Sequence, residues 1–552
     1  MMIQNPILPG FNPDPSILRV GEDYYIATSS FEWFPGVPVY HSRDLCHWEF
    51  MDYLLKTKDY LDLTGEKPSR GVWAPALSYC EREKRFFLMF SNVHNQNKWL
   101  FDVDNYVIWA EDIRGPWSKP VYLNSSGFDP SLFHDDDGRK WVVNKDRDFR
   151  PANIDLRAIV IQELDTKAMK LVGSPAVISR GVTQRRFVEG SHIYKRDGWY
   201  YLVTAEGGTG YGHCAALSRS RSVTGPYEPS PYNPLITSAA EEFSATEAIS
   251  FMMPDRYNPN ADLQKAGHAS LVETQTGEWY LAHLCGRPVM PQLRCILGRE
   301  TALQRMKWTE DGWLVKAEGS PLALSQVPAP NLPLHPFAPE PPLSDFDGGV
   351  LDPQFCTPRN EITADWADMT TRKGYLRLRG RESLTSNYFV SLLARRLTAF
   401  HVKATAKLLY QPEHYHHLAG ITCYYDSESH YCAYKTYDET TGQAILSAYS
   451  FIGAQMTFLE VAVPVPMNEP VWLMAEINAH TLQFHYSLNG EDFLPLGGTL
   501  DMTALSDEAS TCGRFTGTFV GMFAQDTHTK SKWADFDSFR YEVLPEQGNR
   551  TC

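Results

Sequence analysis

The most restrictive feature of this sequence is a hairpin-like pattern that occurs five times in its first 300 residues. Each copy has a turn-rich lead-in, an apolar stretch, a polar or glycine-containing turn and a second, aromatic stretch. Apolar stretches bounded by turn residues are typical of β-hairpins. The pattern therefore predicts one supersecondary unit repeated along the chain, at residues 10–27, 73–89, 129–143, 189–202 and 268–281.

Aligning the five copies places one residue of each at an equivalent position, just before its first strand. These residues are Asp14, Ala74, Asp129, Glu189 and His268, separated by 60, 55, 60 and 79 positions. A strand-rich repeat of this length is typical of the blades of a β-propeller, in which four-stranded sheets surround a central channel. Equivalent ends of the innermost strands meet at the axis of such a ring. The sequence therefore predicts that three carboxylates and a histidine converge on one spot.

A proline-rich stretch separates these repeats from the rest of the chain. It has seven prolines between positions 328 and 342, which suits an extended connector and not a sheet interior. Alternating apolar runs return from about Phe346 and favour a β-sandwich. We therefore expect an all-β protein. Its predicted parts are a five-bladed β-propeller domain (1–322), a linker (323–345) and a jelly-roll, concanavalin-like β-sandwich domain (346–552).

Composition limits the partners of this chain. Its 552 residues are too many for one ordinary core, which agrees with two domains. The net charge of −15 without a basic cluster argues against nucleic acid and anionic membranes, and favours a neutral small molecule. No apolar run has membrane length, and no signal peptide is visible. The ten scattered cysteines lack a CxxC pair and are expected as reduced thiols, so we expect a cytoplasmic protein.

Three carboxylates in one pocket repel one another, so at least one should keep its proton near neutral pH. A protonated acid beside an ionised carboxylate is the equipment for glycoside hydrolysis. Considered one at a time, these residues have ordinary structural explanations. Asp14 and Asp129 have the pattern of turn residues, Glu189 that of an ion-pair partner and His268 that of a core histidine. Their shared position across the blades favours function, because burying three carboxylates without one would cost stability.

The three acidic motifs, at residues 11–16, 127–133 and 188–192, resemble those of family 43 of the glycoside hydrolases. The match is best with its two-domain β-xylosidase branch, a five-bladed propeller followed by a β-sandwich. The resemblance covers essentially the whole chain, with supporting motifs at residues 29–39, 72–75, 266–268, 284–288, 297–301 and 514–522. It implies an inverting enzyme in which Asp14 is the general base that activates water and Glu189 is the general acid. Asp129 would raise the pKa of Glu189 and hold its orientation.

The resemblance also implies a substrate pocket around these carboxylates. Arg299 would bind substrate hydroxyls, and Phe31 and Trp73 would form apolar walls against the sugar. Phe515 of the sandwich would close one side, although the sequence leaves open whether Phe515 or Phe519 faces the pocket. The alternatives are an interblade ion pair for Arg299 and core packing for the aromatic residues.

His268 lies under the site, near the propeller axis, in the family that this chain resembles. Some members hold a divalent cation beside it, so a calcium ion near the axis stays an open alternative. We expect no required cofactor and no metal ligand among the site residues. A self-associating sandwich domain leads us to expect a homo-oligomer, either a dimer or a tetramer.

The substrate that we expect is a small oligosaccharide. The first hypothesis is a β-xylosidase that removes terminal β-1,4-linked xylose from xylo-oligosaccharides, with α-L-arabinofuranosidase side activity. The second is an α-L-arabinofuranosidase or arabinan-degrading enzyme, and the third a non-catalytic carbohydrate-binding propeller. A retaining, sucrose-type hydrolase would have Asn-Asp-Pro-Asn where this chain has Asn-Pro-Asp-Pro at 12–15. Two departures from the family pattern, Ser191 in place of a proline and the segment 147–155, bear on the substrate.

Overall fold

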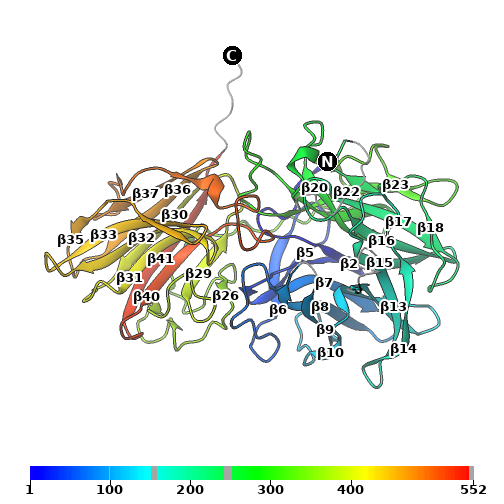
Figure 1. Ribbon diagram of the computed structural model, residues 1–552, viewed down its shortest axis with the longest axis horizontal. Coiled ribbons are helices and arrows are strands. Elements are labelled where there is room, and N and C mark those ends of the chain that lie inside the picture. The colour runs from blue at the N-terminus through cyan, green and yellow to red at the C-terminus, as the bar shows by residue number, and fades with distance from the viewer. Residues whose placement is uncertain (98–99, 149, 151–157, 241–251, 546–552) are drawn as a thin grey trace, which may run out of the picture.

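The computed structural model describes residues 1–97, 100–148, 150, 158–240 and 252–545. It has two all-β bodies side by side, a propeller formed by the first part of the chain and a β-sandwich formed by the last (Figure 1). The predicted fold class is therefore confirmed. The described residues contain no helix that is long and apolar enough to cross a membrane.

Each of the five blades is a sheet in which consecutive antiparallel strands are neighbours. The first blade is β2 (Ser16–Val20), β3 (Asp23–Ala27), β5 (Gly36–Ser42) and β6 (Glu49–Leu55). The second is β7 (Gly71–Cys80), β8 (Arg85–Gln96), β9 (Phe101–Ala110) and β10 (Val121–Asn124). The third is β11 (Gly127–His134), β12 (Lys140–Asp146), β13 (Ala158–Asp165) and β14 (Lys170–Ser179). The fourth is β15 (Glu189–Arg196), β16 (Trp199–Glu206), β17 (Cys214–Ser220) and β18 (Glu228–Pro229), with β19 (Ile236–Thr237) also on β17. The fifth is β20 (Gln264–Glu273), β21 (Trp279–Gly286), β22 (Glu300–Trp308) and β23 (Leu314–Lys316).

The blades pack face to face because their strands are apolar on both sides. On β8, Leu88 and Phe90 pack in a core with side chains of the first blade, whereas Phe87 and Met89 pack in another core with the third blade. Successive residues of a strand point to opposite faces, so this continuous apolar run serves two interfaces. The same pattern in each blade keeps the ring together and holds the innermost strands around the axis.

The two ends of the propeller are joined by a strand pair and by hydrogen bonds. β1 (Met2–Gln4) pairs with β24 (Gln326–Pro328), which follows the last blade. Between the first and last blades, the Ser270 hydroxyl accepts a hydrogen bond from the Ile17 amide at 2.9 Å and donates one to the Pro15 carbonyl at 2.7 Å. These bonds lie directly beside Asp14, so ring closure also fixes the backbone of that residue.

The sandwich has two packed antiparallel sheets. One contains β27 (Ala367–Asp368), β28 (Leu376–Arg379), β41 (Trp533–Val543), β30 (His401–Leu409), β36 (Val471–Asn478), β37 (Thr481–Ser487) and β38 (Leu494–Pro495), with β25 (Leu343–Ser344) and β39 (Leu500–Asp501) at its side. The other contains β29 (Ser391–Arg396), β40 (Phe519–Asp526), β31 (His417–Asp426), β32 (Ser429–Asp438), β33 (Gln443–Ile452) and β34 (Gln455–Phe458), with β35 (Val463–Val465). Alternate residues such as Leu393, Ile421, Leu473 and Phe536 fill one core between them. Two short 3-10 helices, η1 (Pro254–Arg256) in the propeller and η2 (Met502–Ala504) in the sandwich, complete the described elements.

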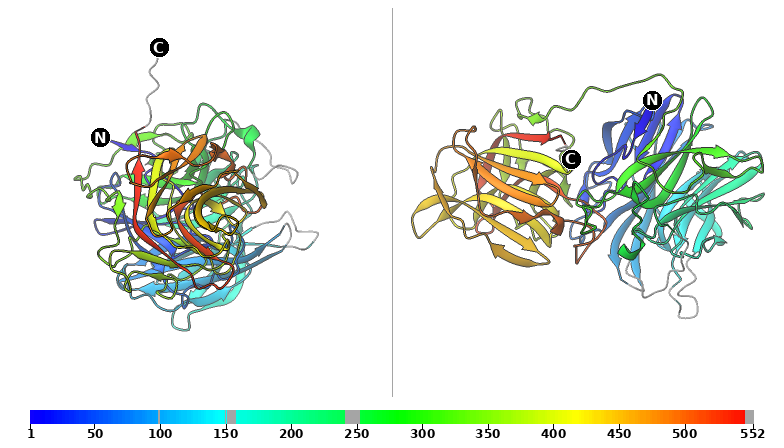
Figure 2. Two further views of the ribbon diagram at one scale, coloured as in Figure 1. Left: turned by 90° about the vertical axis from the view of Figure 1, so that its left-hand side faces the viewer. Right: turned by 90° about the horizontal axis from the view of Figure 1, so that it is seen from above.

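The domains are joined by a connector and by direct contacts. Since β24 belongs to the propeller and β25 pairs with β41, the strand-free connector is residues 329–342, which run from one body to the other (Figure 2). β4 (Trp33–Phe34) of the propeller pairs with β26 (Thr357–Pro358) beside the sandwich. The fully buried Lys265 of the propeller forms ion pairs with two sandwich carboxylates, Asp507 at 3.3 Å and Glu508 at 2.7 Å. The two bodies are thus docked through strands and charges.

Candidate active site

The residues at the repeated position share an unusual backbone conformation. Asp14, Ala74, Asp129 and His268 all have positive φ angles, of 56°, 37°, 55° and 47°. In the fourth blade this conformation belongs to Gly190, at 55°, so Glu189 lies one residue earlier than the sequence alignment places it. Strand register agrees, because Phe128 in the third blade and Glu189 in the fourth are the last paired residues before the bulge. The alignment is wrong by one residue there, and a glycine takes the left-handed position that strains other residues.

Asp14 lies in a buried network that favours its ionised form. One carboxylate oxygen accepts a hydrogen bond from the Ser29 hydroxyl at 2.7 Å, and the other lies 3.2 Å from an Arg299 guanidinium nitrogen and 3.6 Å from His268 Nδ1. Burial alone would raise the pKa of Asp14, but Arg299, His268 and Ser29 outweigh it and hold the pKa below its ordinary value. Asp14 is therefore a carboxylate that can accept a proton.

Asp129 and Glu189 are both buried and differ in charge. Burial, together with the nearby charges of Glu189 and Asp14, raises the pKa of Asp129 to about 7. Burial also opposes ionisation of Glu189, but the Lys145 ammonium lies 2.8 Å from its Oε2 and holds the pKa of Glu189 below its ordinary value. The expectation that one acid keeps its proton near neutral pH is met by Asp129. The raised pKa that the resemblance implies for Glu189 is not found.

Asp129 also contacts the backbone that carries Glu189. Its Oδ2 accepts a hydrogen bond from the Gly190 amide at 3.0 Å, so the third blade holds the start of β15 in the fourth. A second bond between these blades runs from the Ser131 hydroxyl to the Ser191 carbonyl at 2.6 Å. The Ser191 hydroxyl is buried and has no partner among the described residues. Asp129 therefore holds the backbone directly after Glu189.

Aromatic residues from both domains form one wall beside the carboxylates. The ring centroids of Phe31, Trp73 and Phe515 lie 5.5–5.9 Å apart in all three pairs. The Phe515 carbonyl accepts a hydrogen bond from Arg299 at 3.1 Å, which ties this sandwich residue to the Asp14 network. Phe519 instead stacks on Trp33 at 3.5 Å and is fully buried. Of the two candidates, Phe515 therefore lies with the predicted pocket residues.

The structure adds residues that sequence reasoning missed. Ser29 accepts a hydrogen bond from the Ala74 amide at 2.7 Å while it donates to Asp14, and so links the first two blades. Lys145 contacts Glu189 and lies 4.6 Å from the ring centroid of Phe128, which itself lies 5.4 Å from that of Trp73. A lysine two positions after the apolar run Trp141–Val143 of β12 was the available signal for Lys145.

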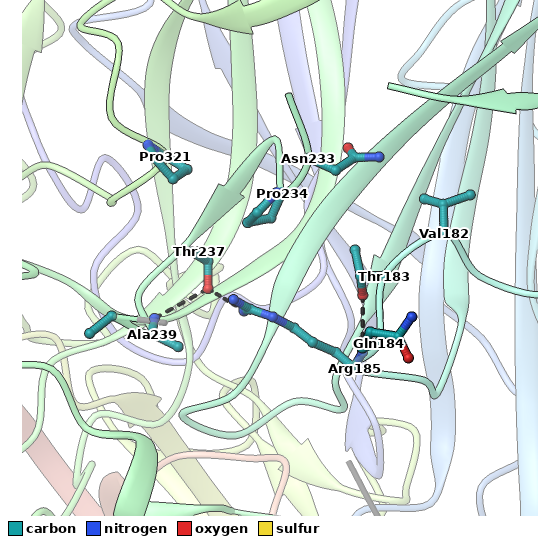
Figure 3. A pocket seen from close by; sticks show the side chains of 10 residues that line it. Val182, Thr183, Gln184, Arg185, Asn233, Pro234, Thr237, Ala239 and Pro321 are labelled. Atoms are coloured by element: carbon teal, nitrogen blue, oxygen red, sulfur yellow. Dashed lines mark hydrogen bonds between the residues drawn. The ribbon is translucent and has the colours of Figure 1, made fainter. Parts of the chain in front are cut away.

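A cavity of about 340 Å³ borders the segment that leads to Glu189 (Figure 3). Among its lining residues, Arg185 is almost fully buried and donates hydrogen bonds to the Thr237 hydroxyl at 2.6 Å and to the Gly212 carbonyl at 3.2 Å. Figure 3 shows this arginine reaching across to Thr237. Arg185 therefore anchors the chain four residues before Glu189.

Two further expectations from the sequence concern a metal ion and the segment 147–155. Among the described residues, no group of three or more His, Cys, Asp or Glu side chains is arranged to hold a metal ion. The segment 147–155, in which the sequence departs from the family pattern, lies mostly outside the described residues, since 149 and 151–157 are not described. Arg147 is described, and its guanidinium lies 3.8 Å from the ring centroid of Phe101.

A five-bladed propeller that brings an ionised carboxylate, a protonated acid and an aromatic wall together defines a glycoside hydrolase. Comparison with known proteins agrees, because residues 3–314 match the profile described as Glycosyl hydrolases family 43. Residues 344–542 match the profile described as Beta xylosidase C-terminal Concanavalin A-like domain. The chain belongs to family 43 of the glycoside hydrolases.

Similar proteins cover the chain from end to end. A protein of Humicola insolens named "Xylosidase/arabinosidase 43B" is 42% identical and covers 99% of both chains. The "Beta-xylosidase" of Bacillus subtilis is 41% identical over 98% of this chain and 100% of its own. The crystal structure of xylan beta-1,4-xylosidase from Bacillus halodurans has a TM-score of 0.92 and 48% identity, over 98% of this chain and 100% of that one.

Proposed function

We propose that this protein is an inverting β-xylosidase that removes terminal xylose from β-1,4-linked xylo-oligosaccharides. The observation that carries the proposal is the difference in charge between the buried carboxyl groups. Asp14 is held ionised by Arg299 and His268, whereas Asp129, with a pKa of about 7, keeps a proton next to Glu189. Hydrolysis with inversion needs one carboxylate as a base and one proton for the leaving group.

In the proposed reaction, Asp14 accepts a proton from a water molecule while that water attacks the anomeric carbon. The bond between this carbon and the glycosidic oxygen breaks, and Glu189 gives its proton to that oxygen. Asp129 and Glu189 lie close enough to couple electrostatically and act as a pair that holds one proton, which must be on Glu189 when the bond breaks. The hydrogen bond from the Gly190 amide to Asp129 Oδ2 keeps this pair in a fixed geometry.

The position of Phe515 supports an exo mode of action. This sandwich residue contacts Phe31 and Trp73, and its carbonyl accepts a hydrogen bond from Arg299. A wall supplied by the second domain limits the length of chain that the pocket can accept, which favours single terminal sugars. Apolar ring faces against the sugar and an arginine for its hydroxyls are the usual means of orienting such a ligand.

An α-L-arabinofuranosidase is the second candidate, because a similar protein carries the name xylosidase/arabinosidase. The test is to compare kcat/KM for an aryl β-D-xylopyranoside and for an aryl α-L-arabinofuranoside with the same aryl group. We expect the xyloside to be preferred and the arabinoside to be a slower substrate. Preference for the arabinoside would replace the proposed substrate, and turnover of neither would contradict the proposal.

A further inference from the structure

Lys145 is a buried cation in contact with the proposed general acid. It follows the apolar residues of β12 and pairs across the sheet with Phe128 of β11, whose ring centroid lies 4.6 Å from the Lys145 ammonium. That ammonium donates a hydrogen bond to Glu189 Oε2 at 2.8 Å. Lys145 is 2% exposed and Glu189 9% exposed, so water screens this ion pair little.

The other charged or titratable groups that face Glu189 come from several elements. They are Asp129 of β11, His268 of β20 and His213 between β16 and β17, and Asp14 before β2 lies near Asp129. Burial lowers the pKa of His213 to about 3, so this histidine is neutral near pH 7. Lys145, by contrast, donates a hydrogen bond directly to the Glu189 carboxylate. Lys145 thus differs from these neighbours in its direct contact with the carboxylate.

We propose that Lys145 is a positioning residue of the reaction. It binds the Glu189 carboxylate, fixes its direction and stabilises the negative charge that Glu189 acquires when it gives up its proton. This inference rests on the proposed function, in which Glu189 protonates the leaving oxygen. The proton moves from Glu189 to that oxygen as the glycosidic bond breaks, and the new carboxylate remains paired with the Lys145 ammonium.

The ion pair between Lys145 and Glu189 has two opposing effects on catalysis. A neighbouring ammonium makes Glu189 a stronger acid, which helps substrates with poor leaving groups. The same ammonium lowers the fraction of enzyme in which Glu189 holds the proton, so activity is lost at a lower pH. Removing the positive charge must therefore move the alkaline limb of the pH profile upward while it weakens the acid.

The test measures kcat/KM against pH for xylobiose, whose leaving group needs a proton, in wild type and in Lys145→Met. We expect the alkaline limb of Lys145→Met to lie about one to three pH units above that of wild type, as for loss of an adjacent opposite charge. The rate on the acidic side of the limb should fall several-fold for xylobiose. An aryl xyloside with an acidic phenol needs little protonation, so its rate should change much less.

Two variants separate this role from a structural one. Lys145→Arg keeps the positive charge, and its limb should stay near that of wild type. Lys140 is a matched control, because it lies on the same strand, is 3% exposed and pairs with Glu83. Lys140→Met should leave the limb unchanged. The proposal would be overturned if the alkaline limb of Lys145→Met lay at the same pH as that of wild type, or if Lys140→Met moved the limb by as much as Lys145→Met. Either result would leave the proposed function intact.

A measurement without turnover keeps the two proposals distinguishable. Carbon-13 NMR of protein labelled at the glutamate carboxyl groups can follow the titration of Glu189, with its signal assigned by its loss in Glu189→Gln. We expect Glu189 of Lys145→Met to titrate at a higher pH than Glu189 of wild type. Equal titration in both proteins would refute the role of Lys145, whether or not the enzyme hydrolyses xylosides.

Discussion

The Asp14 carboxylate and the Arg299 guanidinium lie 3.2 Å apart although 285 positions separate them in the chain. Both side chains are almost fully buried, at the junction of the first and last blades. Since a buried carboxylate without a partner is costly, Arg299 explains how Asp14 stays ionised in this position. The junction that closes the ring thus also creates the proposed base.

Replacing this base tests its role. Asp14→Asn keeps the size of the side chain but cannot take the proton of the attacking water. We expect kcat to fall by about a hundredfold or more on both xylobiose and activated aryl xylosides, because both need water activation. Steady-state assays give the result, with circular dichroism as the control for folding. Selective loss on xylobiose alone would contradict the assignment of Asp14 as base.

The acid should show a different dependence on the leaving group. Glu189→Ala removes the proton donor, so we expect near-complete loss of activity on xylobiose and a much smaller loss on aryl xylosides with acidic phenols. A plot of log kcat/KM against leaving-group pKa should be steeper for the variant than for wild type. Equal loss on both classes of substrate would mean that Glu189 is not the acid.

Asp129 should reduce stability at neutral pH. Its pKa of about 7 lies above the ordinary value of a carboxyl group, so the folded protein binds a proton that the unfolded chain has released. The stabilisation linked to this proton is complete below about pH 4 and is lost as the pH rises to about 7. We therefore expect Asp129→Asn to gain melting temperature relative to wild type as the pH rises through this range, and to lose activity. A difference in melting temperature that does not change with pH would contradict the raised pKa.

The buried charges between the domains give a prediction about stability. Lys265 lies 2.7 Å from Glu508, and Glu508 also accepts a hydrogen bond from the Cys295 amide at 2.7 Å. Lys265→Met leaves two buried carboxylates without their cation, and we expect it to cost about 3–5 kcal/mol of unfolding free energy. The triple variant that also has Asp507→Asn and Glu508→Gln should recover part of this loss. An unchanged denaturation midpoint for the single variant would argue against this ion cluster as a link between domains.

The propeller could be predicted from the sequence because its blades repeat a local pattern. Each hairpin is specified by its own turns and apolar stretches, and equivalent strand ends must meet at the axis whatever the details of each blade. That reasoning brought Asp14, Asp129 and His268 to one position, where the structure gives them the same left-handed backbone. It placed Glu189 one residue off because the bulge at Gly190 and Ser191 depends on backbone conformation, which spacing does not reveal.

Contacts between blades and between domains could not be predicted from the sequence. Phe515 and Phe519 are equally apolar, and only tertiary packing places the first against Phe31 and the second on Trp33. The charge of Glu189 likewise depends on Lys145 from the neighbouring blade, at 2.8 Å. Pair electrostatics of this kind depend on distance and burial, so the expected order of pKa values in the acid pair could not be obtained from residue types alone.

The most direct test of the central claim is the anomeric configuration of the first product. Proton NMR during hydrolysis of an aryl β-D-xylopyranoside at high enzyme concentration shows which anomer of xylose forms before mutarotation. If Asp14 activates a water that attacks the anomeric carbon directly, the first xylose released is the α-anomer. Initial release of β-xylose would mean retention through a covalent intermediate, and would contradict the roles given to Asp14 and Glu189.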